Sequence, residues 1–355
     1  MDVETKIELV KKPPTEEIIT EKDLRELLET NEKPKHYIGF EISGMLHLGT
    51  LFMCGYKIND LTKAGFDCTV FLADWHSYIN RKLGGSWENI LKAARYFEET
   101  FKFFCPKVKI ALGSELYHNN DEYWKDVIRF CSKVTLKRVV RCLTIMGRKE
   151  EESLTFAQYL YPPMQAVDVK YLGNDLPHGG MDQRKVHVLC REVFPKLGWQ
   201  KPVALHHHLL TGLAEPPEAK SKEEWVLEAK MSKSKPYTAI FIHDTYEEIE
   251  EKIKKAWCPA GQVEDNPVLE ICKYIIFRER DSLFIKRPKK YGGDLELQSY
   301  SELEEIYAKG ELHPLDLKKA VAAALDEIIK PIREYFEKPS KAKLLDVFKE
   351  AEVTR

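Results

Sequence analysis

Two short segments carry residues whose types and spacing suit chemistry on a phosphate. In the first, an apolar run from Tyr37 breaks at Ser43-Gly44, and His47-Leu48-Gly49-Thr50 begins a helix. A strand, a turn and a helix N-terminus direct free backbone N–H groups and the helix dipole at one point, where a phosphate can bind. Gly49 would let a nucleotide lie against the backbone, and His47 could donate a hydrogen bond to a phosphate oxygen. On this segment alone, a structural histidine that caps the helix is an equal alternative.

The second segment is Lys230-Met231-Ser232-Lys233-Ser234. Two lysines and two serines in five residues would form an ordinary surface turn in most proteins. The two segments resemble, in this order, the HIGH and KMSKS signatures of class I aminoacyl-tRNA synthetases, and together they are far more specific than either alone. The first departs from its signature at Thr50, where the class has histidine, although a hydroxyl can still donate to a phosphate.

A third group of polar residues lies within the apolar stretch 156–173. If this stretch is a helix, Tyr161, Gln165 and Asp168 share one stripe, with Tyr171 following three residues later. Burying such a stripe is costly unless a polar ligand satisfies it. A partly exposed face with ordinary side-chain bonds is the alternative.

A segment with two glycines and a segment with three histidines follow. Gly179-Gly180 precede a helix whose first turn carries Asp182 and Gln183, an arrangement that nucleotide folds use to meet a ribose. The triplet 206–208 is all histidine and ends a short strand predicted at 203–207. Strand alternation would split these rings between two faces, and no acid or cysteine completes a set of ligands. We therefore predict no metal centre.

Strand and helix patterns alternate around these residues. Strands are predicted at 37–42, 67–74 and 108–112, a loop begins at Trp75, and a helix spans about 87–104. Such alternation predicts an α/β fold with a parallel, doubly wound sheet, whose ligands bind at the carboxyl ends of the strands. Tyr37, Gly39, Asp74 and His76 fall at or beside that edge.

The length of 355 residues favours two domains. We predict a helical leader at 1–35 with Thr20 as its helix N-cap, a nucleotide-binding domain at 36–260, and a mainly α-helical domain at 261–355. A helical insertion occupies about 117–160, and Pro331 should kink a helix of the last domain. Residues 215–229 are a Pro- and charge-rich surface connection.

Charge and composition limit the class of protein further. The formal net charge is −2, but 133–149 holds six Lys/Arg and no acid, and 273–290 holds seven against two acids. One such run is usually a solvated face, whereas two would let a protein hold a structured RNA at two places. No apolar run approaches the roughly 18 residues of a membrane span, and no signal peptide is visible. We expect no membrane association, a cytoplasmic protein, and eight cysteines that are buried free thiols.

With both signatures, the Tyr/Gln/Asp stripe and the Gly-Gly-Met-Asp-Gln-Arg segment in sequence, the chain resembles the tyrosine-specific class I synthetases of archaeal and eukaryotic type, from about Thr20 to Phe336. The resemblance implies a Rossmann-like catalytic domain, a connective insertion and an anticodon-binding domain at 261–355. It also implies that L-tyrosine and ATP, with Mg²⁺, form tyrosyl-adenylate, and that the tyrosyl group passes to tRNA(Tyr). The insertion would carry the interface of a homodimer.

The same resemblance assigns roles by position. Tyr37 and Asp168 would bind the substrate phenol, and its ammonium end would meet Tyr161, Gln165 and Gln183. ATP would contact Gly39, His47, Gly49, Thr50, Asp182, Lys230, Ser232 and Lys233, of which His47, Lys230 and Lys233 would act in catalysis. Contacts to tRNA would come from Arg141 and Arg184 at the first acceptor pair, and from Tyr291, His313 and Asp316 at the first anticodon base.

Two rival functions remain at this point. A tryptophan-specific synthetase shares the fold and both signatures, but an indole offers only a donor, whereas Tyr37 and Asp168 suit a phenolic hydroxyl. A paralogue that binds RNA without catalysis would be expected to have lost His47, Asp182 or the loop lysines, and all are present.

Overall fold

The chain divides into two compact units, which are described separately. A computed structural model describes residues 1–147, 154–219 and 221–350. The first unit comprises Met1–Gly44, Cys54–His208 and the described residues from Leu344 onward, and the second comprises Met45–Met53 and Leu209–Lys343. The predicted boundary at residue 260 therefore falls inside the second unit, and the predicted functional domains stay a prediction.

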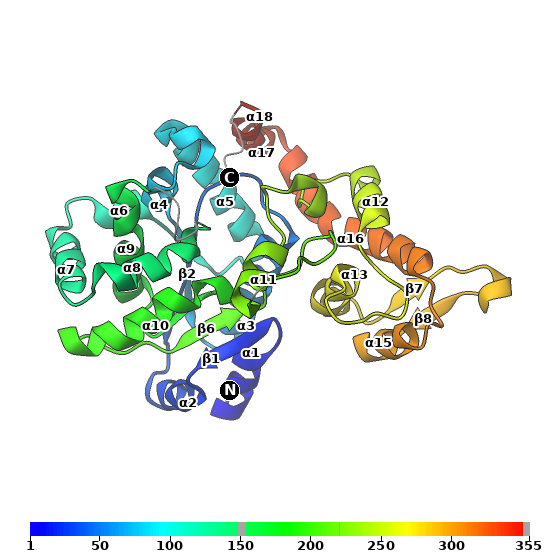
Figure 1. Cartoon of the computed structure of the whole chain (residues 1–355), viewed down its shortest axis with the longest axis horizontal. Helices are drawn as coiled ribbons and strands as arrows, with labels where there is room; N and C mark the ends of the chain where they lie inside the picture. Colours follow the sequence, from blue (N-terminus) through cyan, green and yellow to red (C-terminus); the bar gives the residue numbers. More distant parts are fainter. Residues whose placement is uncertain (148–153, 220, 351–355) are drawn as a thin grey trace. The chain divides into compact units, whose positions relative to one another are not determined.

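A six-stranded sheet forms the centre of the first unit (Figure 1). Its order is β1 (Thr15–Ile19), β6 (Ala204–His207), β5 (Leu176–Gly180), β2 (Lys35–Phe40), β3 (Asp67–Leu72) and β4 (Lys109–Leu112). Every neighbouring pair is parallel except β1 with β6, which is antiparallel. The strand order reverses direction between β5 and β2, so the sheet is doubly wound and the predicted α/β class is confirmed.

Local sequence signals account for the elements that were predicted well. Strands β2 and β3 are apolar runs inside the sheet. Strand β4 is an apolar run at the edge of the sheet, where it pairs with β3. Helix α3 (Leu48–Lys63) begins directly after His47. Helix α5 (Trp87–Phe104) covers the predicted range, and its first turn is capped by the Ser86 hydroxyl, which accepts from the backbone N–H of Asn89.

Two elements of the first unit differ from the prediction. The leader does contain helices α1 (Val3–Lys11) and α2 (Glu21–Thr30), and the Thr20 hydroxyl caps α2 by accepting from Asp23 N, as predicted. It also contains β1, whose Glu16 and Glu17 weaken the apolar signal and which is a strand because it pairs with β6. The loop predicted from Trp75 is wrong, because helix α4 (Asp74–Ile79) begins there.

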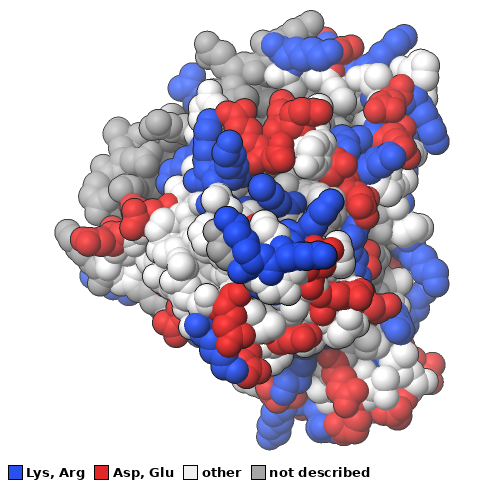
Figure 2. Space-filling view, turned by 90° about the vertical axis from the view of Figure 1, so that its right-hand side faces the viewer, with Lys and Arg blue, Asp and Glu red and all other residues white. Residues whose placement is uncertain are grey.

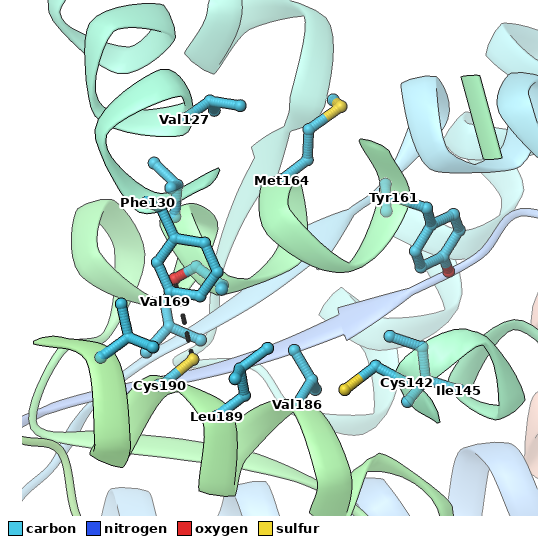
Figure 3. Packing of buried hydrophobic residues seen from close by; sticks show 14 of the residues in the cluster. Val127, Phe130, Cys142, Ile145, Tyr161, Met164, Val169, Val186, Leu189 and Cys190 are labelled. Carbon is cyan, nitrogen blue, oxygen red and sulfur yellow. Dashed lines mark hydrogen bonds between the residues drawn. The ribbon is translucent and has the colours of Figure 1, made fainter. Parts of the chain in front are cut away.

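The predicted helical region after β4 is a series of short helices: α6 (Gly113–Tyr117), α7 (Asp121–Cys131), α8 (Leu136–Cys142) and the 3₁₀ turn η2 (Leu143–Met146). Helix α9 (Phe156–Leu172) follows, and after β5 the chain continues through η3 (Met181–Gln183), α10 (Arg184–Val193) and η4 (Phe194–Leu197). Apolar side chains of α7, α9 and α10 meet in one buried cluster (Figure 3). This packing fixes α9, which carries the predicted polar stripe.

The second unit is mainly helical. It contains α11 (Lys222–Ala229), η5 (Pro236–Thr238), α12 (Tyr246–Lys255), α13 (Pro267–Ile271), the π-helical turn η6 (Cys272–Ile276), α14 (Phe277–Glu279), the hairpin β7 (Leu283–Ile285) with β8 (Leu295–Leu297), joined by η7 (Lys289–Tyr291), α15 (Tyr300–Ala308), α16 (Pro314–Glu337) and α17 (Pro339–Ala342). The connection predicted at 215–229 thus includes a helix. Helix α16 runs through Pro331 without a break and packs against α12, so residues 209–260 belong to this unit. Of the helices in the described ranges, none is long and apolar enough to cross a membrane.

Candidate active site

The first unit holds a fully buried carboxylate, Asp168, on α9. Its Oδ1 accepts two hydrogen bonds, from the hydroxyl of Tyr117 at 2.9 Å and from that of Tyr123 at 2.8 Å. Its Oδ2 lies 3.6 Å from His76 Nε2, and no hydrogen bond reaches Oδ2 from the described part of the chain. Burial raises the pKa of Asp168 to about 8, although the bonds from Tyr123 and Tyr117 lower it. A buried oxygen without a partner is a position where a ligand's donor would be stabilising.

Tyr37 on β2 lies against the end of α9, the helix that carries Asp168. A Cβ on Gly173, which ends α9, would stand 2.4 Å from Tyr37 Cβ, so only glycine allows this approach. Burial raises the pKa of Tyr37, and Asp168 raises it further. Tyr37 therefore remains a protonated phenol. The structure thus brings together the two residues that were predicted to meet the substrate phenol.

Gln165 and Gln183, two of the residues predicted to hold the ammonium group, are hydrogen-bonded to each other. Gln165 Nε2 donates to Gln183 Oε1 at 3.0 Å, and Gln183 Nε2 donates to the Ile145 carbonyl at 3.2 Å. Tyr161 is buried, and its ring packs edge-on against His76 with centroids 4.4 Å apart. The three residues predicted to hold an ammonium group therefore lie on neighbouring elements of this unit.

Glu41 is a member of this site that the sequence analysis missed. Burial raises the pKa of Tyr161, and the Glu41 carboxylate raises this pKa further through its negative charge and by accepting a hydrogen bond from the phenol. Glu41 Oε1 also accepts from Asn80 Nδ2 at 2.8 Å, and Oε2 lies 3.4 Å from Lys82 Nζ. The only local signal was an acid directly after β2, which is a common place for an acid.

Both signature segments lie in the second unit. His47 forms an isolated antiparallel bridge with Phe241, and Leu48 N donates to the Ile240 carbonyl at 3.0 Å. Burial, together with the charges of Lys233 and Lys230, lowers the pKa of His47 to about 3. The imidazole is therefore neutral beside two cationic side chains. This arrangement can bind a polyphosphate without placing a third positive charge there.

The KMSKS-like segment itself is held by backbone bonds. Lys230 bridges to Thr211, and Met231 N donates to the Leu210 carbonyl at 2.7 Å, while the Met231 side chain is buried. The Ser232 hydroxyl lies 3.0 Å from that of Ser234. One buried side chain thus anchors the segment and leaves its polar residues nearer the surface.

Thr50, the departure from the class signature, contacts His47 directly. Its hydroxyl lies 3.0 Å from His47 Nε2, whereas the buried Nδ1 has no hydrogen-bond partner among the described residues. A hydroxyl that donates to Nε2 places the single ring proton on Nδ1. In this tautomer Nδ1 is the only donor of the ring. Gly49 is also close, since a Cβ there would stand 3.2 Å from His47 Cε1.

We expect Thr50→Val to slow adenylate formation about 5-fold, because one lost hydrogen bond to the ring is worth about 1 kcal/mol and the proton is no longer held on Nδ1. Thr50→Ser keeps the hydroxyl and should keep the rate. Single-turnover formation of adenylate with both variants measures the difference. Equal rates for Val and Ser would show that the hydroxyl has no such role.

Asp182 and Arg184 lie at the junction of β5 and α10, next to a chain of buried histidines. Arg184 Nε donates to the Glu17 carboxylate at 2.9 and 3.0 Å, and Glu17 Oε2 lies 2.9 Å from His206 Nδ1. His206 Nε2 lies 3.0 Å from His187 Nδ1. Burial lowers the pKa of His206 and of His187, while Asp182 acts in the opposite direction on both. These rings are therefore neutral and bonded to one another.

The predicted RNA contacts lie in several places. Arg141 is exposed on α8. In the second unit, Arg287 Nη1 donates to the Glu311 carbonyl at 3.1 Å, which ties the β7–β8 hairpin to the loop before His313. The side chain of Tyr291 is outside the described ones, and Asp316 is in the first turn of α16.

Exposed basic side chains lie on the connection between β7 and β8, at Lys286, Lys289 and Lys290. Figure 2 looks onto the side where Figure 1 draws this hairpin, and it shows Lys and Arg side chains gathered at the middle of the view with acidic side chains around them. These side chains make the hairpin connection a basic surface, and Arg287 ties it to the loop before His313.

Comparison with known proteins agrees with these features. The family described as tRNA synthetases class I (W and Y) matches residues 29–330. A tyrosine–tRNA ligase of Thermococcus kodakarensis is 51% identical, with 100% of both chains covered. The chain belongs to the tyrosine–tRNA ligases of class I.

Solved structures of this ligase family have the same fold. The tyrosyl-tRNA synthetase of Pyrococcus horikoshii, solved with L-tyrosine, is 48% identical with a TM-score of 0.91, over 98% of this chain and 100% of that one. The enzyme of Aeropyrum pernix is 41% identical with a TM-score of 0.85, over 98% and 99%. The predicted function as a tyrosine–tRNA ligase is confirmed, and the tryptophan-specific and non-catalytic alternatives are set aside.

Proposed function

We propose that this tyrosine–tRNA ligase recognises its amino acid through Tyr37 and Asp168 and activates it with His47, Lys230 and Lys233. The observation that carries the proposal is the buried Asp168, whose Oδ2 lacks a partner among the described residues. When Asp168 is ionised, a phenolic O–H donates to this oxygen, and the charged acceptor makes the bond stronger than a neutral one.

The other end of tyrosine binds the polar stripe. The Tyr161 hydroxyl and the amide oxygens of Gln165 and Gln183 accept from the ammonium group, and Glu41 adds a negative charge beside Tyr161. These contacts fix the orientation of the bound tyrosine, and its carboxylate is left available for reaction.

Activation is an attack of that carboxylate on the α-phosphorus of ATP, with pyrophosphate as the leaving group. No general base is needed, because the nucleophile is already an anion. His47 and the lysines Lys230 and Lys233 stabilise the charge that grows on the phosphate oxygens. Gly39, Gly49, Thr50, Asp182 and Ser232 complete the proposed ATP contacts.

Mg²⁺ is proposed to accompany the triphosphate of ATP. Among the described residues no three His, Cys, Asp or Glu side chains come together as a metal site. Mg²⁺ at nucleotide sites is bound largely by phosphates and water and does not require such a set. The catalytic roles proposed above therefore belong to protein side chains, and none is assigned to Mg²⁺.

We also propose a homodimer formed through α7, α8 and α9. Large apolar side chains are exposed on these three helices, at Ile128 (69% exposed), Leu136 (66%) and Phe156 (80%). Exposed apolar side chains on neighbouring helices favour a protein interface. Measurement of the molecular mass in solution tests the dimer. A cytoplasmic location is proposed as well, since the eight cysteines are free thiols.

The proposed tRNA contacts can be separated from amino-acid activation. We expect Arg141→Ala or Arg184→Ala to weaken charging about 10-fold and to relax the preference for the first acceptor pair, because each removes a charged contact. Tyr291→Ala should relax the anticodon preference through loss of base stacking. Pyrophosphate exchange should stay unchanged in all three. A parallel loss of exchange would place these residues in the catalytic site instead.

Amino-acid-dependent exchange of labelled pyrophosphate into ATP, run with each of the twenty amino acids, tests the proposal as a whole. Tyrosine should give the fastest exchange, and Asp168→Asn should reduce the exchange with tyrosine more than that with phenylalanine. If Asp168→Asn lowers both equally, Asp168 does not bind the phenol.

A further inference from the structure

The carboxylate of Asp168 is held from one side by two tyrosines that the sequence analysis did not assign to the site. Tyr117 on α6 and Tyr123 on α7 both donate to Oδ1, and their rings lie 4.5 Å apart. Each carboxylate oxygen has about two lone pairs, so these two bonds use the acceptor capacity of Oδ1. Oδ2 has no such partner among the residues described.

We propose that Tyr117 and Tyr123 are positioning residues that set the preference for tyrosine, by occupying Oδ1 of Asp168 and leaving Oδ2 for the substrate phenol. This inference rests on the proposed assignment of Asp168 to that phenol. The inference adds a cause of the preference for tyrosine, because the two tyrosines donate to one oxygen of Asp168 and leave the other oxygen available to the substrate.

The protons of both phenols are held in place. Burial raises the pKa of Tyr117 and of Tyr123, and the nearby Asp168 raises both further, so both remain donors. Tyr123 has one proton and two oxygens within reach, Asp168 Oδ1 at 2.8 Å and the Met164 carbonyl at 3.2 Å. The shorter contact to the charged acceptor is the stronger one.

The helices that carry these tyrosines are themselves fixed. The Asp74 carboxylate accepts from Ser114 N at the start of α6, at 3.0 and 3.2 Å. A Cβ on Gly113 would stand 2.5 Å from Asp74 Oδ1, so glycine is needed for this contact. The Asn120 side chain caps α7 by accepting from Tyr123 N at 3.2 Å. The two donors therefore reach Oδ1 from two anchored helices and fix the plane of the carboxylate.

A fixed carboxylate makes rejection of phenylalanine stronger. When phenylalanine enters, no phenol reaches Oδ2. Because Oδ1 is held, the carboxylate cannot turn toward His76, whose Nε2 stays 3.6 Å from Oδ2, too far for a hydrogen bond. The buried oxygen is then left without a partner, which is costly. Without the two tyrosines the carboxylate is free to rotate, so the penalty for phenylalanine decreases and the bond to tyrosine weakens.

The test uses Tyr117→Phe, Tyr123→Phe and the double variant of the full-length enzyme. Pyrophosphate exchange is measured with tyrosine and with phenylalanine, and KM is separated from kcat. We expect each single change to raise KM for tyrosine about 10-fold, the double change to raise it about 100-fold, and phenylalanine to be used as well as before or better. Loss of discrimination through KM is a result that general damage to the fold would not give.

Tyr171→Phe is the matched control. Tyr171 lies on the same helix as Asp168, but its hydroxyl donates to another carboxylate, Asp126 Oδ2, at 3.1 Å. This variant should keep the discrimination of the unmodified enzyme. The inference would be overturned if Tyr117→Phe and Tyr123→Phe left the ratio of kcat/KM for tyrosine to that for phenylalanine unchanged, whether both values fell equally or neither changed.

Asp168→Asn separates this inference from the assignment on which it rests. One outcome is that Asp168→Asn reduces the ratio of kcat/KM for tyrosine to that for phenylalanine while the Tyr117 and Tyr123 variants leave this ratio unchanged. In that case the positioning role is wrong and the assignment of Asp168 stands. If Asp168→Asn keeps full discrimination, the assignment itself is wrong and the positioning role falls with it.

Discussion

His47→Ala and Lys233→Ala are each expected to slow adenylate formation about 100-fold or more while tyrosine affinity stays nearly unchanged. Both side chains belong to the second unit, where the lysines lower the pKa of a His47 ring that burial already keeps neutral. They act on charge that develops on ATP, so their loss affects the transition state more than the bound tyrosine. Single-turnover adenylate formation and equilibrium binding of tyrosine measure the two effects separately.

Lys235→Ala is a suitable control for the lysine. Lys235 is exposed, lies two residues beyond Lys233, and donates to the Glu228 carbonyl at 3.2 Å. Removing it changes the charge of the segment without removing a signature residue, and the rate should change little. If His47→Ala or Lys233→Ala weakened tyrosine binding as much as it slowed the reaction, the proposed action on the transition state would be wrong.

Asp168→Gly is expected to lower kcat/KM for tyrosine about 100-fold and to narrow the gap to phenylalanine and to para-substituted analogues. A hydrogen bond from the phenol to a buried carboxylate is worth about 1.5–3 kcal/mol, and the carboxylate penalises a ligand without that donor. Removing the side chain removes both effects. Glycine also opens space near the ring, which should help larger para substituents.

Kinetics of adenylate formation with tyrosine, phenylalanine and tryptophan decide this prediction. Asp168→Asn serves as a second variant that keeps the volume, in case glycine weakens α9. Full discrimination against phenylalanine in Asp168→Gly would refute the assignment of this pocket, and so would a preference of the unmodified enzyme for tryptophan.

The sequence by itself determined the local elements and the order of the signatures. The run Lys35–Phe40, the break at Ser43-Gly44 and the helix after His47 are neighbours in the chain, so their pattern predicts a strand, a turn and a helix. The helix period likewise places Tyr161, Gln165 and Asp168 on one stripe of α9. These predictions need only short-range geometry.

Only the tertiary structure decided which side chains complete the site. Tyr117 and Tyr123 are 51 and 45 residues from Asp168 in the chain, and nothing in their local pattern distinguishes them from core aromatics. Strand β1 was missed for the same reason, since its polar sequence forms a strand only by pairing with β6. Contacts between distant segments depend on how helices and strands pack against one another, and residue spacing along the chain does not predict them.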